Sequence, residues 1–382
     1  MKKAVFRLAA SVVCLCAALL LAGFAPQDDA AKDMEEFSRA VLKGDAAALE
    51  KFGCDKDAIR RSEAEALKES SERMGRPLPE KSILRWEDVF LEAAGKCEPR
   101  VKVLAAGADK RTVEISFEAI DHRQIDIRKA IAYFLRNDNP QCNRWEMWEM
   151  VENYMIAAFK ALEPSDTKRL QVSCVYDEEK GVWLPEDLPA FIHELMTLAS
   201  GRDATGDPAK DIEAVARAFL RQDLSILEDW GFGELITSAN FHEAAVKSLA
   251  QKWKKEFDDE LTEEQSLRLA EATLEATGRA DVQARTLRRE GEFAEVELTV
   301  GVMEPFPQKE MAEVRKRVPP DASMKEAIGI FVDEMVSRLE QVQPSRTKTI
   351  QVSCAYSSVL RVWAPIESRK FLNELLVAPW AS

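Results

Sequence analysis

Residues 164–196 read PSDTKRLQVSCVYDEEKGVWLPEDLPAFIHELM, and residues 344–376 read PSRTKTIQVSCAYSSVLRVWAPIESRKFLNELL. The two stretches align without a gap at an offset of 180 residues, and 15 of the 33 aligned positions are identical. Identity of this extent at one constant offset indicates an internal duplication. We therefore expect two homologous domains in tandem rather than one fold that runs through the whole chain.

The repeated stretch predicts two strands followed by a helix. Apolar residues alternate with polar ones at Leu170, Val172, Cys174 and Tyr176, and again at Ile350, Val352, Cys354 and Tyr356. A period of two places such residues on one face of a strand. Val-Trp-Leu-Pro and Val-Trp-Ala-Pro then give a short second strand, which ends at proline. Gly181 suits the turn between the strands, and because the second copy has Arg361 there, we expect its turn to differ.

The rest of each copy is expected to be helical at first, then to form a strand pair and a long helix. Asp45 is a good N-cap, and Thr262-Glu263-Glu264-Gln265 is typical of a capping box. We expect Gly95 and Gly278 to close helices in the left-handed conformation. The last element before the final strand pair is a long helical crossover in both copies. We expect it over 127–135 and 145–162 in the first copy, interrupted at 137–140, and over about 323–342 in the second.

These elements predict an α+β protein of two tandem homologous domains. Each domain is expected to hold a roughly four-stranded antiparallel sheet packed with helices. The boundaries that we predict are 26–199 for repeat domain 1, 200–208 for a linker (SGRDATGDP) and 209–382 for repeat domain 2.

The beginning of the chain is typical of a secretory signal peptide. It has a basic start, an apolar run over 8–21 and small residues that end at Ala25. The run is short for a membrane span, which needs about 20 residues. Phe24 stands where a lipoprotein would carry its lipidated cysteine. We expect residues 1–25 to be removed, and the mature protein to be periplasmic or secreted without a lipid anchor or membrane span.

Charge and cysteine content limit the classes of partner and cofactor. The formal net charge of −14 opposes binding to nucleic acid, which requires a basic surface. After removal of residues 1–25, five cysteines remain, so at least one is unpaired. Cys174 and Cys354 are expected in the core, and Cys54 and Cys97 are the candidate disulfide. The sequence has no Cys-x-x-Cys motif, and we expect no cofactor and no metal.

Two features resemble a known superfamily. The runs Leu-Lys-Gly-Asp-Ala-Ala-Ala-Leu at 42–49 and Leu-Arg-Gln-Asp-Leu-Ser-Ile-Leu at 220–227 resemble the opening helix of the nuclear-transport-factor-like (cystatin-like) superfamily. The strand, turn, Val-Trp-Leu-Pro and helix ending is similar to bacterial exported domains of unknown function, which often occur in tandem. The resemblance implies an α+β fold with concave sites and carries over no catalytic residue. The chain departs from it in lacking the lipid-attachment cysteine and in the long inserted helix.

Candidate site residues are few. None of the three histidines, His122, His193 and His242, has a partner at metal-ligand spacing, and no nucleotide-binding or hydrolase motif is present. Aromatic and sulfur-containing side chains crowd one helix of the first copy, at Trp145, Trp148, Met150 and Tyr154. They are interpreted either as a ligand or partner surface or, with greater weight, as core packing.

We therefore expect an exported, non-catalytic binding or interaction protein. The alternatives are a carrier of a small apolar ligand, favoured by a cavity beneath the strands, and an enzyme with an unrecognised site.

Overall fold

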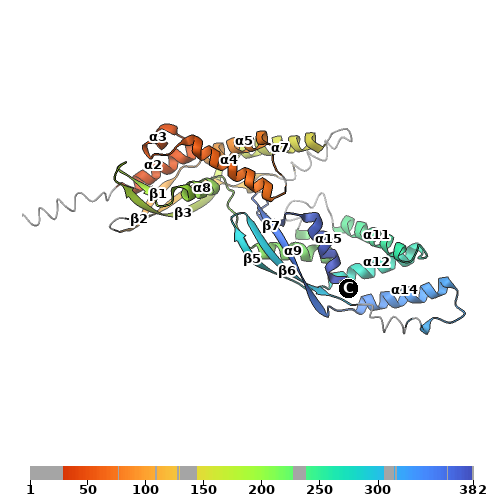
Figure 1. Ribbon diagram of the computed structural model, residues 1–382. Helices are drawn as coiled ribbons and strands as arrows, with labels where there is room; N and C mark the ends of the chain where they lie inside the picture. Colours follow the sequence, from red (N-terminus) through yellow and green to blue (C-terminus); the bar gives the residue numbers. More distant parts are fainter. Residues whose placement is uncertain are drawn as a thin grey trace, which may run out of the picture. The chain divides into compact units, whose positions relative to one another are not determined.

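The computed structural model describes residues 29–382 except 76, 108–109, 127–128, 130–143, 227–237, 305–313, 315, 359 and 381–382. The predicted signal peptide and Cys142 lie outside the described residues. The chain divides into two compact units, residues 1–124 with 152–202 (unit 1) and residues 125–151 with 203–382 (unit 2). Each unit has its own sheet (Figure 1).

Unit 1 contains the described elements of the first copy, except that residues 144–151 of α7 belong to unit 2. In chain order these are α2 (Ala30–Lys43), α3 (Ala46–Lys51), α4 (Lys56–Arg73), α5 (Glu80–Ala94), β1 (Arg100–Ala106), β2 (Lys110–Ile120), η1 (His122–Gln124), α7 (Arg144–Lys160), β3 (Pro164–Asp177), β4 (Val182–Pro185) and α8 (Leu188–Ala199). The strands are antiparallel in the order β1-β2-β3-β4. Helices α2 and α8 pack against this sheet (Figure 1).

Unit 2 repeats this arrangement. Its described elements are α9 (Pro208–Arg221), α11 (Ser238–Glu256), α12 (Glu263–Gly278), β5 (Val282–Glu290), β6 (Phe293–Val302), α14 (Met324–Gln341), β7 (Arg346–Ser357), β8 (Val362–Pro365), α15 (Ser368–Val377) and η2 (Ala378–Trp380). The strand order is β5-β6-β7-β8, again antiparallel, and α9 and α15 pack on the sheet. The predicted α+β class, with two four-stranded antiparallel sheets each packed with helices, is confirmed.

The core of each unit lies between its sheet and these helices. In unit 1, Phe37 of α2, Ile115 of β2, Trp183 of β4 and Leu195 of α8 are all within 1% of full burial. Alternate residues of β2 are buried, as the period of two predicts. These side chains belong to the hydrophobic core beneath the first sheet.

The first strand of each sheet, β1 or β5, lies at a sheet edge and carries a β-bulge at the same place. The register of β1 with β2 shifts between Val103 and Ala105, and that of β5 with β6 shifts between Thr286 and Arg288. The intervening residues, Leu104 and Leu287, are 42% and 44% exposed. A bulge interrupts the row of free backbone groups at a sheet edge, which disfavours edge-to-edge pairing.

The helix caps follow the sequence prediction in two cases and depart from it in two. Asp45 caps α3, and Thr262 with Gln265 forms a capping box on α12. The expected left-handed glycines are wrong, since Gly95 has φ −62 and Gly278 belongs to α12. A Cβ on Gly95 would lie 3.5 Å from the Leu42 oxygen, and one on Gly278 would lie 3.4 Å from the Leu220 oxygen. At these distances a Cβ would make an ordinary van der Waals contact, so these two contacts do not require glycine.

The expectation that the two final hairpin turns differ is also wrong. Gly181 has φ 68, and Arg361, at the same place in the second copy, has φ 55. In both turns the amide of this residue donates to a carbonyl four residues earlier, Asp177 O at 2.8 Å and Ser357 O at 2.6 Å. The geometry of the ladder therefore imposes a left-handed residue, and the second copy accepts an arginine there.

Candidate functional site

A buried tryptophan on the last strand of each sheet is held by an aspartate of the first helix. Trp183 is 1% exposed, and its backbone N–H donates to Asp33 Oδ2 at 3.0 Å. Trp363 is fully buried, and its N–H donates to Asp211 Oδ2 at 2.9 Å. Burial raises the pKa of both carboxyl groups, and the hydrogen bond from tryptophan partly offsets this rise. The pair joins a short edge strand to the opening helix in both units.

A guanidinium group stacks on each of these tryptophans, but it comes from different strands. The Cζ atoms of Arg111 on β2 and Arg289 on β5 each lie 5.0 Å from the ring centroid of Trp183 and Trp363, respectively. Arg111 lies opposite Ala106 in the first ladder, whereas Arg289 lies opposite Ala294 in the second. The arginine is therefore on the second strand of the first sheet and on the first strand of the second sheet, with alanine opposite it in both. The cation–π contact to tryptophan is present in both units.

This duplicated cluster is built for stability. Arg111 is 4% exposed and donates to the carbonyl groups of Gly107 and Lys110. Arg289 donates to Gly206 O at 3.0 Å and Ala204 O at 2.7 Å. The guanidinium groups of both arginines thus donate hydrogen bonds to backbone carbonyls of the chain itself. We assign the cluster to the scaffold.

The predicted surface on the long helix of the first copy is only partly described. Trp145 and Trp148 belong to α7, but their side chains lie outside the described residues. Met150 and Tyr154 are half-buried. The C-terminal half of α7 packs on α5, where the ring of Phe159 lies 5.3 Å from that of Trp86. The interpretation of these residues as a ligand or partner surface stays a prediction.

The structure does not contain the disulfide that the sequence suggested between Cys54 and Cys97. Cys54 and Cys97 are both free. Cys97 is fully buried with its Sγ 3.6 Å from Ala199 O, and burial raises its pKa to about 12. The Cys54 thiol instead lies 4.0 Å from Phe52 O. Cys174 and Cys354 are fully buried, as predicted.

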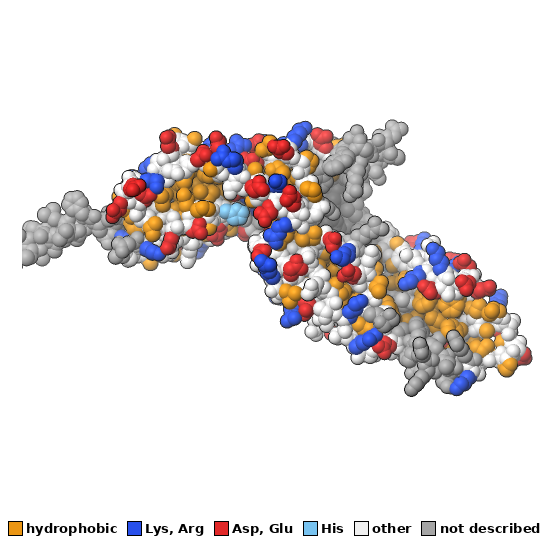
Figure 2. Space-filling model, viewed as in Figure 1, with side chains coloured by type: hydrophobic (Ala, Val, Ile, Leu, Met, Phe, Trp, Pro, Cys, Tyr) orange, Lys and Arg blue, Asp and Glu red, His pale blue; other side chains and the backbone are white. Residues whose placement is uncertain are grey.

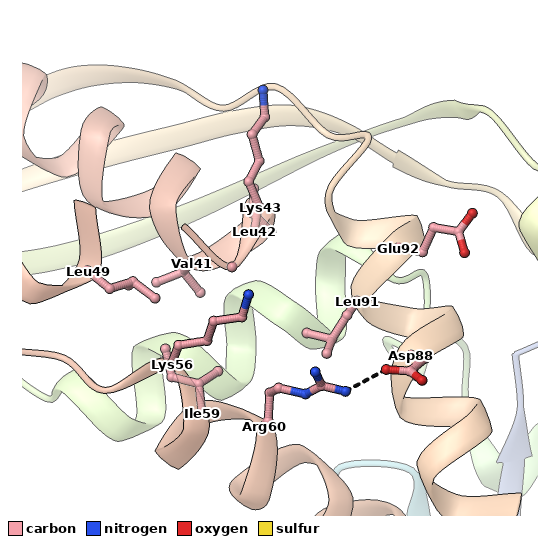
Figure 3. A pocket seen from close by; sticks show the side chains of 11 residues that line it. Val41, Leu42, Lys43, Leu49, Lys56, Ile59, Arg60, Asp88, Leu91 and Glu92 are labelled. Carbon is pink, nitrogen blue, oxygen red and sulfur yellow. Dashed lines mark hydrogen bonds and ion pairs between the residues drawn. The ribbon is translucent and has the colours of Figure 1, made fainter. Parts of the chain in front are cut away.

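A pocket opens in unit 1 where α2, α3, α4 and α5 meet (Figure 3). Its volume is about 230 Å³. The apolar part of its lining comes from four elements: Val41 and Leu42 of α2, Leu49 of α3, Ile59 of α4 and Leu91 of α5. The first four of these are at most 8% exposed, so this lining continues into the core. We call this site the Lys56 pocket.

Charged groups form the rest of its lining. They are Lys43, Lys56, Arg60, Asp88 and Glu92. Arg60 pairs with Asp88 across the pocket, as Figure 3 shows, and its Nε donates to Glu87 Oε1 at 2.7 Å. Lys56 extends into the pocket from α4, whereas Lys43 and Glu92 extend away from its centre (Figure 3). The site can therefore hold a small molecule with an apolar part and a polar end.

A second, more polar pocket of about 280 Å³ lies in unit 2 beside Gly301 and Pro344. Its lining includes Asp281, Gln283, Thr299 and Arg346, and Arg346 pairs with Glu304 at 3.0 Å. A Cβ on Gly301 would lie 2.9 Å from Pro344 Cβ, so glycine is required by packing there. Pro344 is the one apolar side chain among the described residues of this lining, and we rank the pocket below the Lys56 pocket.

The histidines serve structural contacts where they are described. His122 is buried, with its ring edge-on to Phe159 and its Nε2 2.7 Å from Ser200 O. His193 Nδ1 lies 3.7 Å from Glu63, a buried carboxylate that also pairs with Arg202 at 2.6 Å. No group of three or more metal-ligating side chains occurs among the residues that the structure describes. Within the same residues, no helix is long and apolar enough to cross a membrane.

Sequence reasoning missed both the Lys56 pocket and the aspartate–tryptophan pairs. The aspartates carried a usable signal, because Asp33 and Asp211 are separated by 178 residues, the same offset that relates Asp45 to Asp223. The pocket carried none, since it depends on the angles between three helices.

Comparisons with known proteins give little further information. No protein family and no curated protein matches the chain. Among solved structures, a protein of Bacillus subtilis subsp. subtilis str. 168 described as a candidate lipoprotein (YcdA) is similar, with 12% sequence identity and a TM-score of 0.36. The similarity covers 74% of this chain and 97% of that chain. A likeness of this extent is too weak to assign a function.

Proposed function

We propose that this chain is an exported, non-catalytic binding protein that holds a small ligand in the Lys56 pocket of unit 1. The observation that carries the proposal is the composition of this pocket. Buried aliphatic side chains from three helices form one part of its lining, and an ammonium group extends into it. Small-molecule sites generally combine an apolar lining with a few placed polar groups.

The binding proposal is tested by closing the pocket. Leu91→Trp adds a large side chain at the lining, and Leu84→Trp, on the same helix at a position that is 50% exposed, is the matched control. Compounds of six to ten non-hydrogen atoms are screened against the methyl groups of Val41, Leu49 and Ile59 by NMR. We expect hits with the wild type and Leu84→Trp that are lost with Leu91→Trp. Hits that are unchanged in Leu91→Trp, or no hits in the wild type, would contradict the proposal.

Export rests on the first 25 residues. The basic start, the short apolar run and the small residues before Pro26 support cleavage after Ala25, and Phe24 in place of cysteine supports a chain without lipid. The intact mass of the protein recovered from the producing cells tests this. A mass equal to residues 26–382 supports the proposal, whereas the mass of the full chain or of a lipid adduct contradicts it.

Contact with another protein is the second candidate, favoured by the exposed leucines on the bulged edge strands. Leu104 and Leu287 occupy the same place in both units. On the visible face of each unit, acidic and basic side chains are interspersed among hydrophobic ones (Figure 2). Cross-linking in the envelope fraction, with the wild type beside Leu104→Asp/Leu287→Asp, tests this. A cross-linked product that survives both substitutions would exclude these leucines.

A further inference from the structure

The charged groups around the Lys56 pocket are paired with one exception. Arg60 pairs with two carboxylates, Glu87 and Asp88, while Lys43 Nζ lies 2.5 Å from Glu98 Oε1 and Lys160 Nζ lies 2.7 Å from Glu92 Oε2. Among the residues that the structure describes, Lys56 has neither an ion pair nor a hydrogen bond through its ammonium group. Lys56 is therefore the one cation of the described lining without a direct ionic partner.

The ammonium of Lys56 lies beside the end of α2. Lys56 is half-buried, and a Cβ built on Gly44 would lie 3.4 Å from Lys56 Cε and 3.6 Å from its Nζ. The aliphatic stem of Lys56 thus packs over a glycine at the end of α2. Figure 3 shows the ammonium beside Val41, on the side of the pocket that faces Leu91. An ammonium placed in this way can contact a polar group that enters the pocket.

We infer that the ligand of the Lys56 pocket is a small aliphatic carboxylate, with its carboxylate on the ammonium of Lys56 and its chain against Val41, Leu49, Ile59 and Leu91. This inference rests on the proposed function and names its ligand class. A carboxylate gives the Lys56 ammonium a direct partner and accepts charge-assisted hydrogen bonds from it. The aliphatic chain removes the apolar lining from water.

The volume sets the size of the ligand. At about 30 Å³ for each non-hydrogen atom, the volume share of a molecule in liquid water, a pocket of about 230 Å³ holds roughly eight such atoms. Hexanoate has this size and serves as the probe. Hexan-1-ol and hexylamine have nearly the same shape and differ at the polar end, so they isolate the contribution of the charge.

Lys56 has one competing role, which is interaction with the carbonyl end of α2. Several of these carbonyls already have donors, because Gly44 N bonds to Ala40 O and Val41 O, and Asp45 N bonds to Ala40 O. A purely structural role predicts that Lys56→Met lowers the thermal stability and leaves the selectivity of the pocket unchanged. A ligand-binding role predicts that Lys56→Met changes the selectivity of the pocket and leaves the thermal stability nearly unchanged.

The experiment titrates each of the three probes into the full mature chain and follows the methyl signals of Val41, Ile59 and Leu91. We expect hexanoate to bind at least tenfold more tightly than hexan-1-ol, and hexylamine to bind least. Lys56→Met should lower the hexanoate affinity at least tenfold, whereas Lys68→Met, an exposed position on the same helix, should not. Lys56→Arg, which keeps the charge, should retain most of the affinity and provides a second variant if Lys56→Met fails to fold.

The failure of this inference is distinct from the failure of the proposed function. Equal binding of hexanoate and hexan-1-ol, or binding of hexanoate that Lys56→Met leaves unchanged, overturns the carboxylate assignment and leaves the pocket as a binding site. The absence of any shift with hexanoate also overturns the assignment. The fragment screen with Leu91→Trp then decides independently whether the pocket binds any small molecule.

Discussion

Asp33 accepts a hydrogen bond at 3.0 Å from the backbone N–H of Trp183, a residue 150 positions further along the chain. The same relationship holds between Asp211 and Trp363 in the second copy, at 2.9 Å. The bond connects helix α2 to strand β4 in unit 1 and helix α9 to strand β8 in unit 2. In each unit this strand is the shortest and lies at the edge of the sheet. The bond is therefore a structural feature that the duplication has kept twice.

Removing the Asp33 acceptor should destabilise unit 1. In Asp33→Ala the buried N–H of Trp183 loses its partner, which costs about 1–3 kcal/mol. Asp33→Asn keeps an acceptor oxygen and should cost much less. Calorimetric scans of both variants, beside Asp211→Ala as the unit 2 counterpart, measure this. Equal stability of Asp33→Ala and Asp33→Asn would show that the hydrogen bond contributes nothing.

The same carboxyl group predicts a pH dependence. Burial raises the pKa of Asp33, so the folded state holds its proton to a higher pH than the unfolded state does. Its contribution to stability is complete below the ordinary aspartate pKa of about 3.9 and is lost as the pH rises through the raised value. The free energy of unfolding of wild type minus that of Asp33→Asn should therefore decrease from pH 4 to pH 7. An increase in urea-unfolding experiments would contradict this.

The left-handed arginine predicts a stabilising substitution. At φ 55, an L side chain at position 361 carries a cost that glycine avoids, of about 1 kcal/mol. Arg361→Gly should therefore be more stable than Arg361→Ala, a comparison in which both variants lack the guanidinium. In the other copy, Gly181→Ala should be less stable than wild type by a similar amount. Thermal unfolding of the three variants checks both signs, and a more stable Arg361→Ala would refute the conformational argument.

The exchanged Arg–Ala pair predicts a rescue. Arg111→Ala removes a cation–π contact and hydrogen bonds to two carbonyl groups, and should cost about 2 kcal/mol. Adding Ala106→Arg recreates the arrangement of unit 2 and should recover at least part of the loss. Ala106→Arg alone places two guanidinium groups at one tryptophan and should not stabilise. Additive effects in urea-unfolding measurements would contradict the exchange.

The free thiols predict an order of alkylation. Burial raises the pKa of Cys97 and Cys354 to about 12 and that of Cys174 to about 11, so these three should resist iodoacetamide until the protein unfolds. Cys54 is half-buried and should react before the other three described thiols. Peptide mass spectrometry before and after denaturation measures this order. A cross-linked Cys54–Cys97 peptide in a non-reduced digest would contradict the free thiols and restore the pairing expected from sequence.

The duplication made most of the fold predictable. Periodicity around Cys174 and Cys354 located the strands, and the capping residues Asp45 and Thr262 located helix starts, because these signals act over a few residues. The errors arose at residues whose backbone conformation depends on the surrounding structure. Gly95 does end α5, but with φ −62 and not in the left-handed conformation, and Arg361 predicts a different turn, although the ladder imposes the same one.

The candidate site was less predictable for the same reason. Lys56 is one lysine among many in the sequence, and only the meeting of α2, α4 and α5 leaves it without a direct ionic partner beside Val41 and Leu91. A search for motifs favours residues that are close in sequence. A pocket lined from several helices has no such signature.

The central claim is that the exported chain binds a small ligand in unit 1, and a native mass spectrum tests it most directly. The mature protein is purified without denaturant and measured under native and denaturing conditions, beside Leu91→Trp and Leu84→Trp. We predict an additional small mass on the wild type and on Leu84→Trp, lost on denaturation and missing from Leu91→Trp. An identical extra mass on Leu91→Trp, or the apo mass alone for the wild type, would contradict the claim.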